Sequence, residues 1–139
     1  MSFCQTVTCL AFILNLNENF GDIMVILYDS LTGNVARFMK KLPVKSTRIV
    51  NDMVMSENFI LVTFTTGLGK IPETTKDFLE ANHPYLKGIA SSGNKNFGTH
   101  FAVAADEISR GYNVPVISKF ELSGTPRDVN LFMKGLRSV

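Results

Sequence analysis

The sequence predicts a doubly wound α/β domain, in which helices cover both faces of a parallel β-sheet. Short apolar runs alternate with amphipathic helical segments along residues 24–139. The apolar runs are continuous, as in strands that are buried on both faces. Polar turns rich in Gly, Ser, Thr and Asn follow three of the runs. In such sheets ligands bind beyond the carboxyl ends of the strands, so these turns are candidates for a binding site.

Five strands are expected from apolar and β-branched runs. They are Met24–Asp29, Thr47–Val50, Phe59–Thr65, Lys87–Ser91 and Pro115–Leu122. The second strand is short and has no convincing helix between it and the third, so one of the crossover connections is reduced.

Four helices are expected from apolar residues spaced at i, i+3, i+4 and i+7. They are Val35–Leu42, Glu73–His83, Gly98–Arg110 and a last helix from Pro126 that carries its apolar stripe through Leu136. Pro43, Pro84 and Gly111 are expected to stop the first three. Thr125 is expected to cap the last helix, with Pro126 at its first position.

Residues 1–23 do not match the pattern that follows them. Val7–Leu14 is apolar but too short to span a bilayer, and it lacks the basic region and cleavage site of a signal peptide. We expect Met24 to be the natural start and residues 1–23 to be a non-native extension; an extra strand or a disordered leader are the alternatives. Residues 24–139 are then one domain.

Charge and cysteine content exclude several classes of function. Residues 1–23 hold two acidic residues and no Lys or Arg, so residues 24–139 carry a net charge of +4. This charge has no basic run typical of nucleic-acid binding; it fits either an acidic partner or ordinary surface charge. Both cysteines, Cys4 and Cys9, precede Met24, so residues 24–139 have no thiol nucleophile and no cysteine metal site. A cytoplasmic location is the default.

The turn Ser30-Leu31-Thr32-Gly33-Asn34-Val35 is the most informative motif. Its hydroxyls and backbone amides could hold an anion, Gly33 permits close approach, and Asn34 could cap the next helix. The turn has no Lys and no G-x-G-x-x-G pattern, so an uncharged nest for a terminal monophosphate is expected rather than a triphosphate site. An ordinary helix cap after a strand uses the same residue types and is the alternative.

Four stretches in order resemble one family. The turn is similar to the FMN-phosphate loop of flavodoxins, although Val35 stands where a hydroxyl is usual. Together with Thr65–Pro72, Ala90–Gly98 and Lys119–Thr125, it resembles the NrdI family, small flavodoxin-like partners of class Ib ribonucleotide reductase. The resemblance covers residues 24–139 and implies FMN as cofactor and a flavodoxin-like strand order of 2-1-3-4-5.

The resemblance implies a role for each loop. The loop after the third strand would face the flavin N5, where the Gly67 peptide can flip cheaply. The loop after the fourth strand would contact the pyrimidine edge, with Phe97 either stacked on the ring or buried as a core residue. The residues expected to contact FMN are Ser30, Leu31, Thr32, Gly33, Asn34, Val35, Thr65, Thr66, Gly67, Leu68, Gly69, Ser92, Gly93, Asn94, Phe97 and Gly98.

The resemblance also implies the function. Electrons from a reductase would reduce the flavin, which would react with dioxygen to give an oxidant at the level of superoxide. This oxidant would serve assembly of the dimanganese-tyrosyl radical cofactor in the small subunit of class Ib ribonucleotide reductase. The chemistry would be that of the flavin, without a catalytic side chain or a protein-bound metal, and neither a nucleic acid nor a membrane is expected as a partner.

Four alternatives are weighed against this function. A generic flavodoxin electron shuttle is usually longer and more acidic than this chain. A receiver domain or a small phosphatase is disfavoured, because Thr65-Thr66 stand where the receiver acceptor Asp would be and residues 24–139 have no Cys. A purely structural domain of the same fold would bind no flavin.

Overall fold

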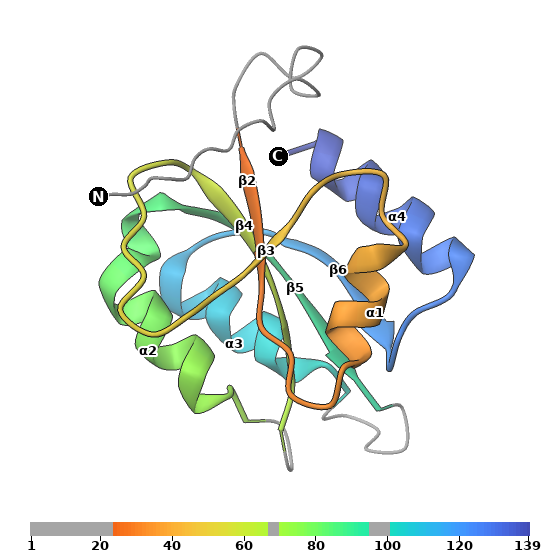
Figure 1. The fold of residues 1–139 in the computed structure, drawn as a ribbon, viewed down its shortest axis with the longest axis horizontal. Helices are drawn as coiled ribbons and strands as arrows, with labels where there is room; N and C mark the ends of the chain where they lie inside the picture. Colours follow the sequence, from red (N-terminus) through yellow and green to blue (C-terminus); the bar gives the residue numbers. More distant parts are fainter. Residues whose placement is uncertain (1–23, 67–69, 95–100) are drawn as a thin grey trace.

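A computed structural model describes residues 24–66, 70–94 and 101–139. These residues form a five-stranded parallel sheet between two layers of helices (Figure 1). The strands are β2 (Val25–Tyr28), β3 (Thr47–Arg48), β4 (Phe59–Phe64), β5 (Leu86–Gly93) and β6 (Val116–Glu121). Their order in the sheet is β3-β2-β4-β5-β6, which confirms the expected 2-1-3-4-5 arrangement. The expectation for residues 1–23 lies outside the described residues.

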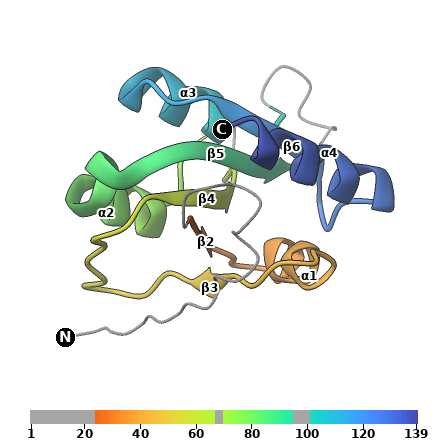
Figure 2. The same cartoon turned by 90° about the horizontal axis from the view of Figure 1, so that it is seen from above.

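Two helices cover each face of the sheet (Figure 2). The helices are α1 (Asn34–Lys40), α2 (Glu73–Asn82), α3 (Val103–Tyr112) and α4 (Pro126–Arg137), with a short 3-10 segment, η2 (His83–Tyr85), after α2. Helices α1 and α4 pack on one face, and α2 and α3 pack on the other. None of these described helices is long and apolar enough to cross a membrane.

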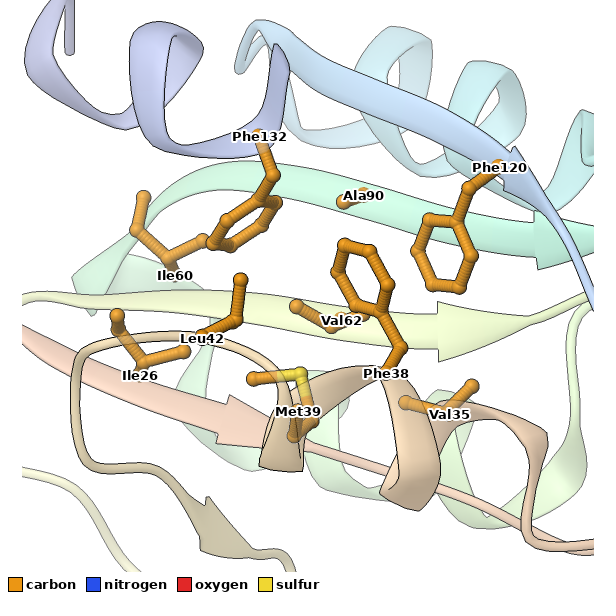
Figure 3. Packing of buried hydrophobic residues seen from close by; sticks show 10 residues of the cluster. All are labelled: Ile26, Val35, Phe38, Met39, Leu42, Ile60, Val62, Ala90, Phe120 and Phe132. Atoms are coloured by element: carbon orange, nitrogen blue, oxygen red, sulfur yellow. The ribbon is translucent and has the colours of Figure 1, made fainter. Parts of the chain in front are cut away.

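The core beneath α1 and α4 is built on three phenylalanines (Figure 3). Phe38 of α1 stacks on Phe120 of β6, with ring centroids 3.8 Å apart, and meets Phe132 of α4 edge-on at 5.7 Å. All three rings are buried. Phe120 lies near the end of β6, an edge strand, and Phe38 lies in α1, so this stack ties the turn before α1 to that edge of the sheet.

Several element ends differ from the sequence-based expectation. Strand β5 continues through Ser92 and Gly93, which were expected in a loop, because both residues pair with β6. Helix α3 begins later than expected and runs past Gly111 to Tyr112. The residue that ends it is Asn113, whose left-handed φ of 58° places its N–H on the Ser109 carbonyl. The prediction of a stop at Gly111 was therefore wrong.

The predicted start of α4 is confirmed. The Thr125 side chain accepts a hydrogen bond from the Asp128 backbone N–H, and the Asp128 side chain accepts one from the Thr125 backbone N–H. This reciprocal pair satisfies two backbone donors at the helix start, and Pro126 occupies the first helical position.

Candidate flavin site

A cavity of about 270 Å³ opens at the carboxyl ends of the strands. Its walls come from the turn after β2, the ends of β4 and β5, and the residue after β6. It is lined by Ser30, Leu31, Thr32, Asn34, Val35, Phe64, Thr65, Thr66, Ser92, Gly93, Asn94 and Leu122. The fold thus brings together residues of all three polar stretches that the sequence predicts.

The turn after β2 presents a run of free backbone donors. In the described residues, the N–H groups of residues 31–35 have no acceptor, whereas the Ala36 N–H donates to Ser30 Oγ at 3.3 Å. The Ser30 hydroxyl proton remains available to a ligand, because the oxygen acts here as an acceptor. Thr32 is exposed beside these donors. Successive unsatisfied N–H groups of this kind form an anion-binding concavity.

Gly33, rather than Asn34, is the N-cap of α1. Its φ of 95° is left-handed, which explains why this position needs glycine, and α1 has no side-chain cap. The Asn34 Oδ1 instead accepts hydrogen bonds from Arg37 and Ser123, so the expected capping role of Asn34 was wrong. The Val35 side chain is buried in the core, which leaves its backbone N–H as the group that can reach the cavity.

Two arginines flank the turn, which the sequence-based expectation of an uncharged nest missed. Arg37 Nη2 lies 2.6 Å from Asn34 Oδ1, and its Nε lies 3.0 Å from Ser123 Oγ. Arg48 lies on β3, the strand that pairs with β2. Its Nη2 donates to the Ser30 carbonyl at 2.6 Å, and its guanidinium lies over the Tyr28 ring. The turn itself holds no charged residue. Its local sequence therefore cannot indicate that two arginines from outside the turn lie beside it.

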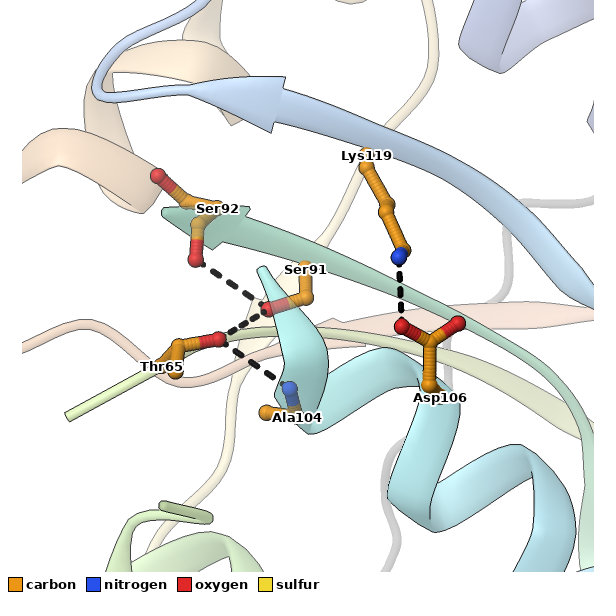
Figure 4. Close-up of polar contacts among 6 residues, drawn as sticks. All are labelled: Thr65, Ser91, Ser92, Ala104, Asp106 and Lys119. Atoms are coloured by element: carbon orange, nitrogen blue, oxygen red, sulfur yellow. Dashed lines mark hydrogen bonds and ion pairs between the residues drawn. The ribbon is translucent and has the colours of Figure 1, made fainter. Parts of the chain in front are cut away.

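The ends of β4 and β5 are joined to α3 by a relay of hydroxyls (Figure 4). The Ala104 N–H donates to Thr65 Oγ1 at 3.2 Å, Thr65 Oγ1 shares a 3.2 Å hydrogen bond with Ser91 Oγ, and Ser91 Oγ donates to the Ser92 carbonyl. Ala102, the N-cap of α3, has no side-chain acceptor, and Thr65 supplies one in its place. The Thr65 hydroxyl therefore holds the framework of the cavity together.

Ser92, Gly93 and Leu122 form the wall between β5 and β6. Ser92 Oγ donates to the Leu122 carbonyl at 2.7 Å, and the Leu122 N–H donates to the Gly93 carbonyl at 3.0 Å. These bonds hold Leu122 at a left-handed φ of 53°, which is rare for leucine. Gly93 is needed for packing, since a Cβ there would lie 2.4 Å from the Ala102 nitrogen.

Of the remaining predicted site residues, the structure describes only some. Thr66 and Lys70 pair through two backbone hydrogen bonds of 2.9 and 2.8 Å. Gly67, Leu68, Gly69, Phe97 and Gly98 lie outside the described residues.

Two apolar lining residues were missed by sequence reasoning. Phe64 directly precedes Thr65 and was assigned to a buried strand, whereas it is half-buried and reaches the cavity. Leu122 belongs to the stretch Lys119–Thr125, in which no cofactor-binding residue was predicted. Its 45% exposure at the end of β6 marks it as more than a core residue.

The donor set fits a flavin mononucleotide. Free N–H groups and hydroxyls on one wall suit a phosphomonoester, which is rich in acceptors and carries negative charge. Phe64 and Leu122 give the cavity apolar surface suited to a flat aromatic ring. In the described residues, no group of three His, Cys, Asp or Glu side chains could hold a metal ion.

Comparisons with known proteins identify the family of this chain. The family model described as NrdI flavodoxin-like matches residues 26–134. Protein NrdI from Bacillus licheniformis is 48% identical over 115 residues, which cover 82% of this chain and 88% of that relative.

Solved flavodoxin structures share the fold. Oxidised flavodoxin 1 from Bacillus cereus has a TM-score of 0.56 and 18% identity, over 82% of this chain and 95% of that structure. A short-chain flavodoxin associated with a bacterial microcompartment has a TM-score of 0.60 and 20% identity, over 83% of this chain and 97% of that structure. Members of the NrdI and flavodoxin families bind FMN. The chain belongs to the NrdI family of flavodoxin-like proteins.

Proposed function

We propose that this chain binds FMN in the cavity at the carboxyl ends of β2, β4 and β5. The phosphate would be held by Ser30, Thr32 and the backbone N–H groups of residues 31–35. The ring would lie between the loops after β4 and β5, with Phe64 and Leu122 against it. Gly67 and Phe97 keep the roles that the family resemblance implies for them.

The observation that carries this proposal is the run of free N–H groups at residues 31–35, opening onto the cavity. An N–H group without an acceptor destabilises the folded protein relative to one that is hydrogen-bonded. A run of such groups is therefore expected where water or a ligand supplies the acceptors. A phosphate offers several acceptor oxygens at one point. The 48% identity to a protein named NrdI supports the same ligand.

We infer that the chain serves class Ib ribonucleotide reductase as a redox partner in the cytoplasm. Bound FMN would supply the redox chemistry, passing electrons from a reductase to dioxygen and so providing an oxidant at the level of superoxide. The small subunit of ribonucleotide reductase would use this oxidant to assemble its dimanganese-tyrosyl radical cofactor. The protein's own residues would bind the cofactor, orient its ring and shape the exit of the oxidant.

The first experiment is a visible absorption spectrum of the purified protein, followed by titration of the apoprotein with FMN. We expect a flavin spectrum and saturable binding. A colourless protein that takes up no FMN would exclude the proposed cofactor site and favour a purely structural domain.

The Thr32→Ala variant tests where the phosphate lies. Loss of one hydrogen bond to a charged group should raise the Kd for FMN about tenfold and leave thermal unfolding of the apoprotein almost unchanged. Thr47→Ala, at an exposed position of β3, is the matched control and should bind FMN as the parent does. An unchanged Kd in Thr32→Ala would place the phosphate elsewhere.

A second experiment separates the proposed function from that of a generic electron shuttle. The reduced protein is mixed with the manganese-loaded small subunit in the presence of dioxygen, and tyrosyl radical is measured by electron paramagnetic resonance. We expect radical to form at a yield that follows the amount of this protein. A shuttle of the ordinary flavodoxin type would give none.

A further inference from the structure

We propose that Arg37 and Arg48 increase the selectivity of the site for a charged phosphomonoester over the same flavin without a phosphate. This inference rests on the proposed FMN site. In that site the turn would touch the phosphate, and the two arginines that we consider here lie outside the turn. Both act by holding the turn and by supplying positive charge, so they are positioning residues.

Each arginine is fixed against one end of the turn. The Arg48 guanidinium contacts the Ser30 carbonyl at the start, at 2.6 Å. The Arg37 guanidinium covers the other end: its Nη1 lies 2.9 Å from where a Cβ on Gly33 would stand, and its Nη2 contacts Asn34. The two cations therefore contact the two ends of the turn that carries the free N–H groups of residues 31–35.

Neither charge is neutralised by a carboxylate in the described part of the chain. The ion pair there is between Lys119 and Asp106, on β6 and α3. Arg37 and Arg48 donate instead to neutral oxygens, those of Asn34, Ser123 and the Ser30 carbonyl. A guanidinium has five N–H donors, so each arginine keeps unused donors as well as its full charge.

The N–H groups and hydroxyls of the turn already favour a phosphate, because hydrogen bonds to a charged oxygen are stronger than those between neutral groups. Two unpaired guanidiniums beside it add a Coulomb attraction that depends on the charge of the ligand and that salt weakens. Among the described residues that line the cavity at β4, β5 and Leu122, none is Arg or Lys. The arginines should therefore increase the discrimination between FMN and riboflavin beyond what the turn itself provides.

The experiment compares the Kd values of FMN and riboflavin for the apoprotein, by flavin fluorescence quenching at low and high salt. Arg37→Gln and Arg48→Gln should each raise the Kd for FMN about fivefold, and the double variant about twentyfold, with less than a twofold change for riboflavin. The salt dependence of FMN binding should be much weaker in the double variant than in the parent.

Two controls separate charge from structure. Lys40→Gln removes one exposed positive charge from the same helix and should leave the ratio of the two Kd values unchanged. Ser123→Ala removes the acceptor of Arg37 Nε but keeps the charge, and it should alter FMN binding less than Arg37→Gln does.

Three outcomes would overturn the inference while leaving the proposed function intact: an unchanged ratio in both arginine variants, an equal loss of FMN and riboflavin, or a Ser123→Ala effect as large as that of Arg37→Gln. A parent protein that binds neither flavin would instead overturn the proposed function, and this inference with it.

Discussion

The helices on one face of the sheet carry the opposite charge from those on the other. Helices α1 and α4 together hold five Arg or Lys and one Asp, a net charge of +4, whereas α2 and α3 hold two Arg or Lys and five Asp or Glu, a net charge of −3. The overall charge of +2 conceals this division. The turn at the candidate phosphate site leads directly into the basic layer, which would favour the approach of an anion.

The two faces also differ in how they are packed. The α1/α4 face is built on the Phe38 ring contacts, whereas the α2/α3 face includes a buried polar cluster. In that cluster the Asp29 side chain accepts hydrogen bonds from Thr74 and Thr75, and Thr75 also pairs with Thr63 at 2.7 Å. Asp29 immediately precedes the Ser30 turn. The turn is thus held by aromatic packing on one side and by directional hydrogen bonds on the other.

The largest effect is expected from removing the central ring of the α1/α4 face. Phe38→Ala should lower the free energy of unfolding by about 4 kcal/mol, because it leaves a cavity and removes two ring contacts. Phe78→Ala on the other face loses one edge-on contact, with Phe59, and should cost about 3 kcal/mol. Urea unfolding measures both. A larger loss in Phe78→Ala would mean that the aromatic stack is not the stronger anchor.

A smaller effect is expected from the polar cluster of the α2/α3 face. Asp29→Ala should cost about 2 kcal/mol, since the buried Thr75 hydroxyl loses an acceptor and Thr74 loses its partner. Asp29→Asn keeps an acceptor oxygen and should cost less. Asp77→Ala, exposed on α2, removes the same charge and should change stability by less than about 0.5 kcal/mol. If Asp29→Ala behaved like Asp77→Ala, the cluster would not anchor the turn.

Effects of opposite sign are expected at two glycines in helices of opposite faces, and the one at Gly111 is the smallest. In α4, a Cβ on Gly135 would lie 2.8 Å from the Ile117 carbonyl oxygen, so Gly135→Ala should destabilise the protein by about 1–3 kcal/mol. In α3, a Cβ on Gly111 would meet nothing within 4 Å, so Gly111→Ala should stabilise it by about 0.5–1 kcal/mol. Thermal unfolding of both variants gives the sign of each change. If both variants changed stability in the same direction, α4 would not pack more closely on β6 at Gly135 than α3 packs on the sheet at Gly111.

The errors in the sequence-based prediction have a common physical origin. Gly111 and Asn113 are both plausible helix ends by type, and tertiary contacts selected the later one, because Tyr112 packs in the core and stacks on His83 at 5.0 Å. Ser92 and Gly93 look like loop residues, yet they belong to β5 because β6 offers them partners across the sheet. Local composition cannot show a partner that lies about 30 residues away.

For the candidate site, the local stretches that form it could be predicted from the sequence. The contacts that these stretches make with residues from other parts of the chain could not. The turn Ser30–Val35 was recognisable from its residue types, since hydroxyls and Gly33 are what such a conformation requires. The cations beside it come from Arg37, one turn into a helix, and from Arg48 on another strand. Thr65 lines the cavity as expected of a cofactor-site residue, and its hydroxyl also accepts a hydrogen bond at the start of α3, which the sequence could not show.

The sequence by itself determined the alternation of strands and helices, the position of the turn Ser30–Val35 and the cap at Thr125, because each depends on residue types a few positions apart. The tertiary structure alone decided which charges flank the turn, how the two faces divide the charge, and that Leu122 adopts a left-handed backbone at the cavity wall. These features depend on contacts between segments distant in the chain, and such contacts exist only once the sheet has formed.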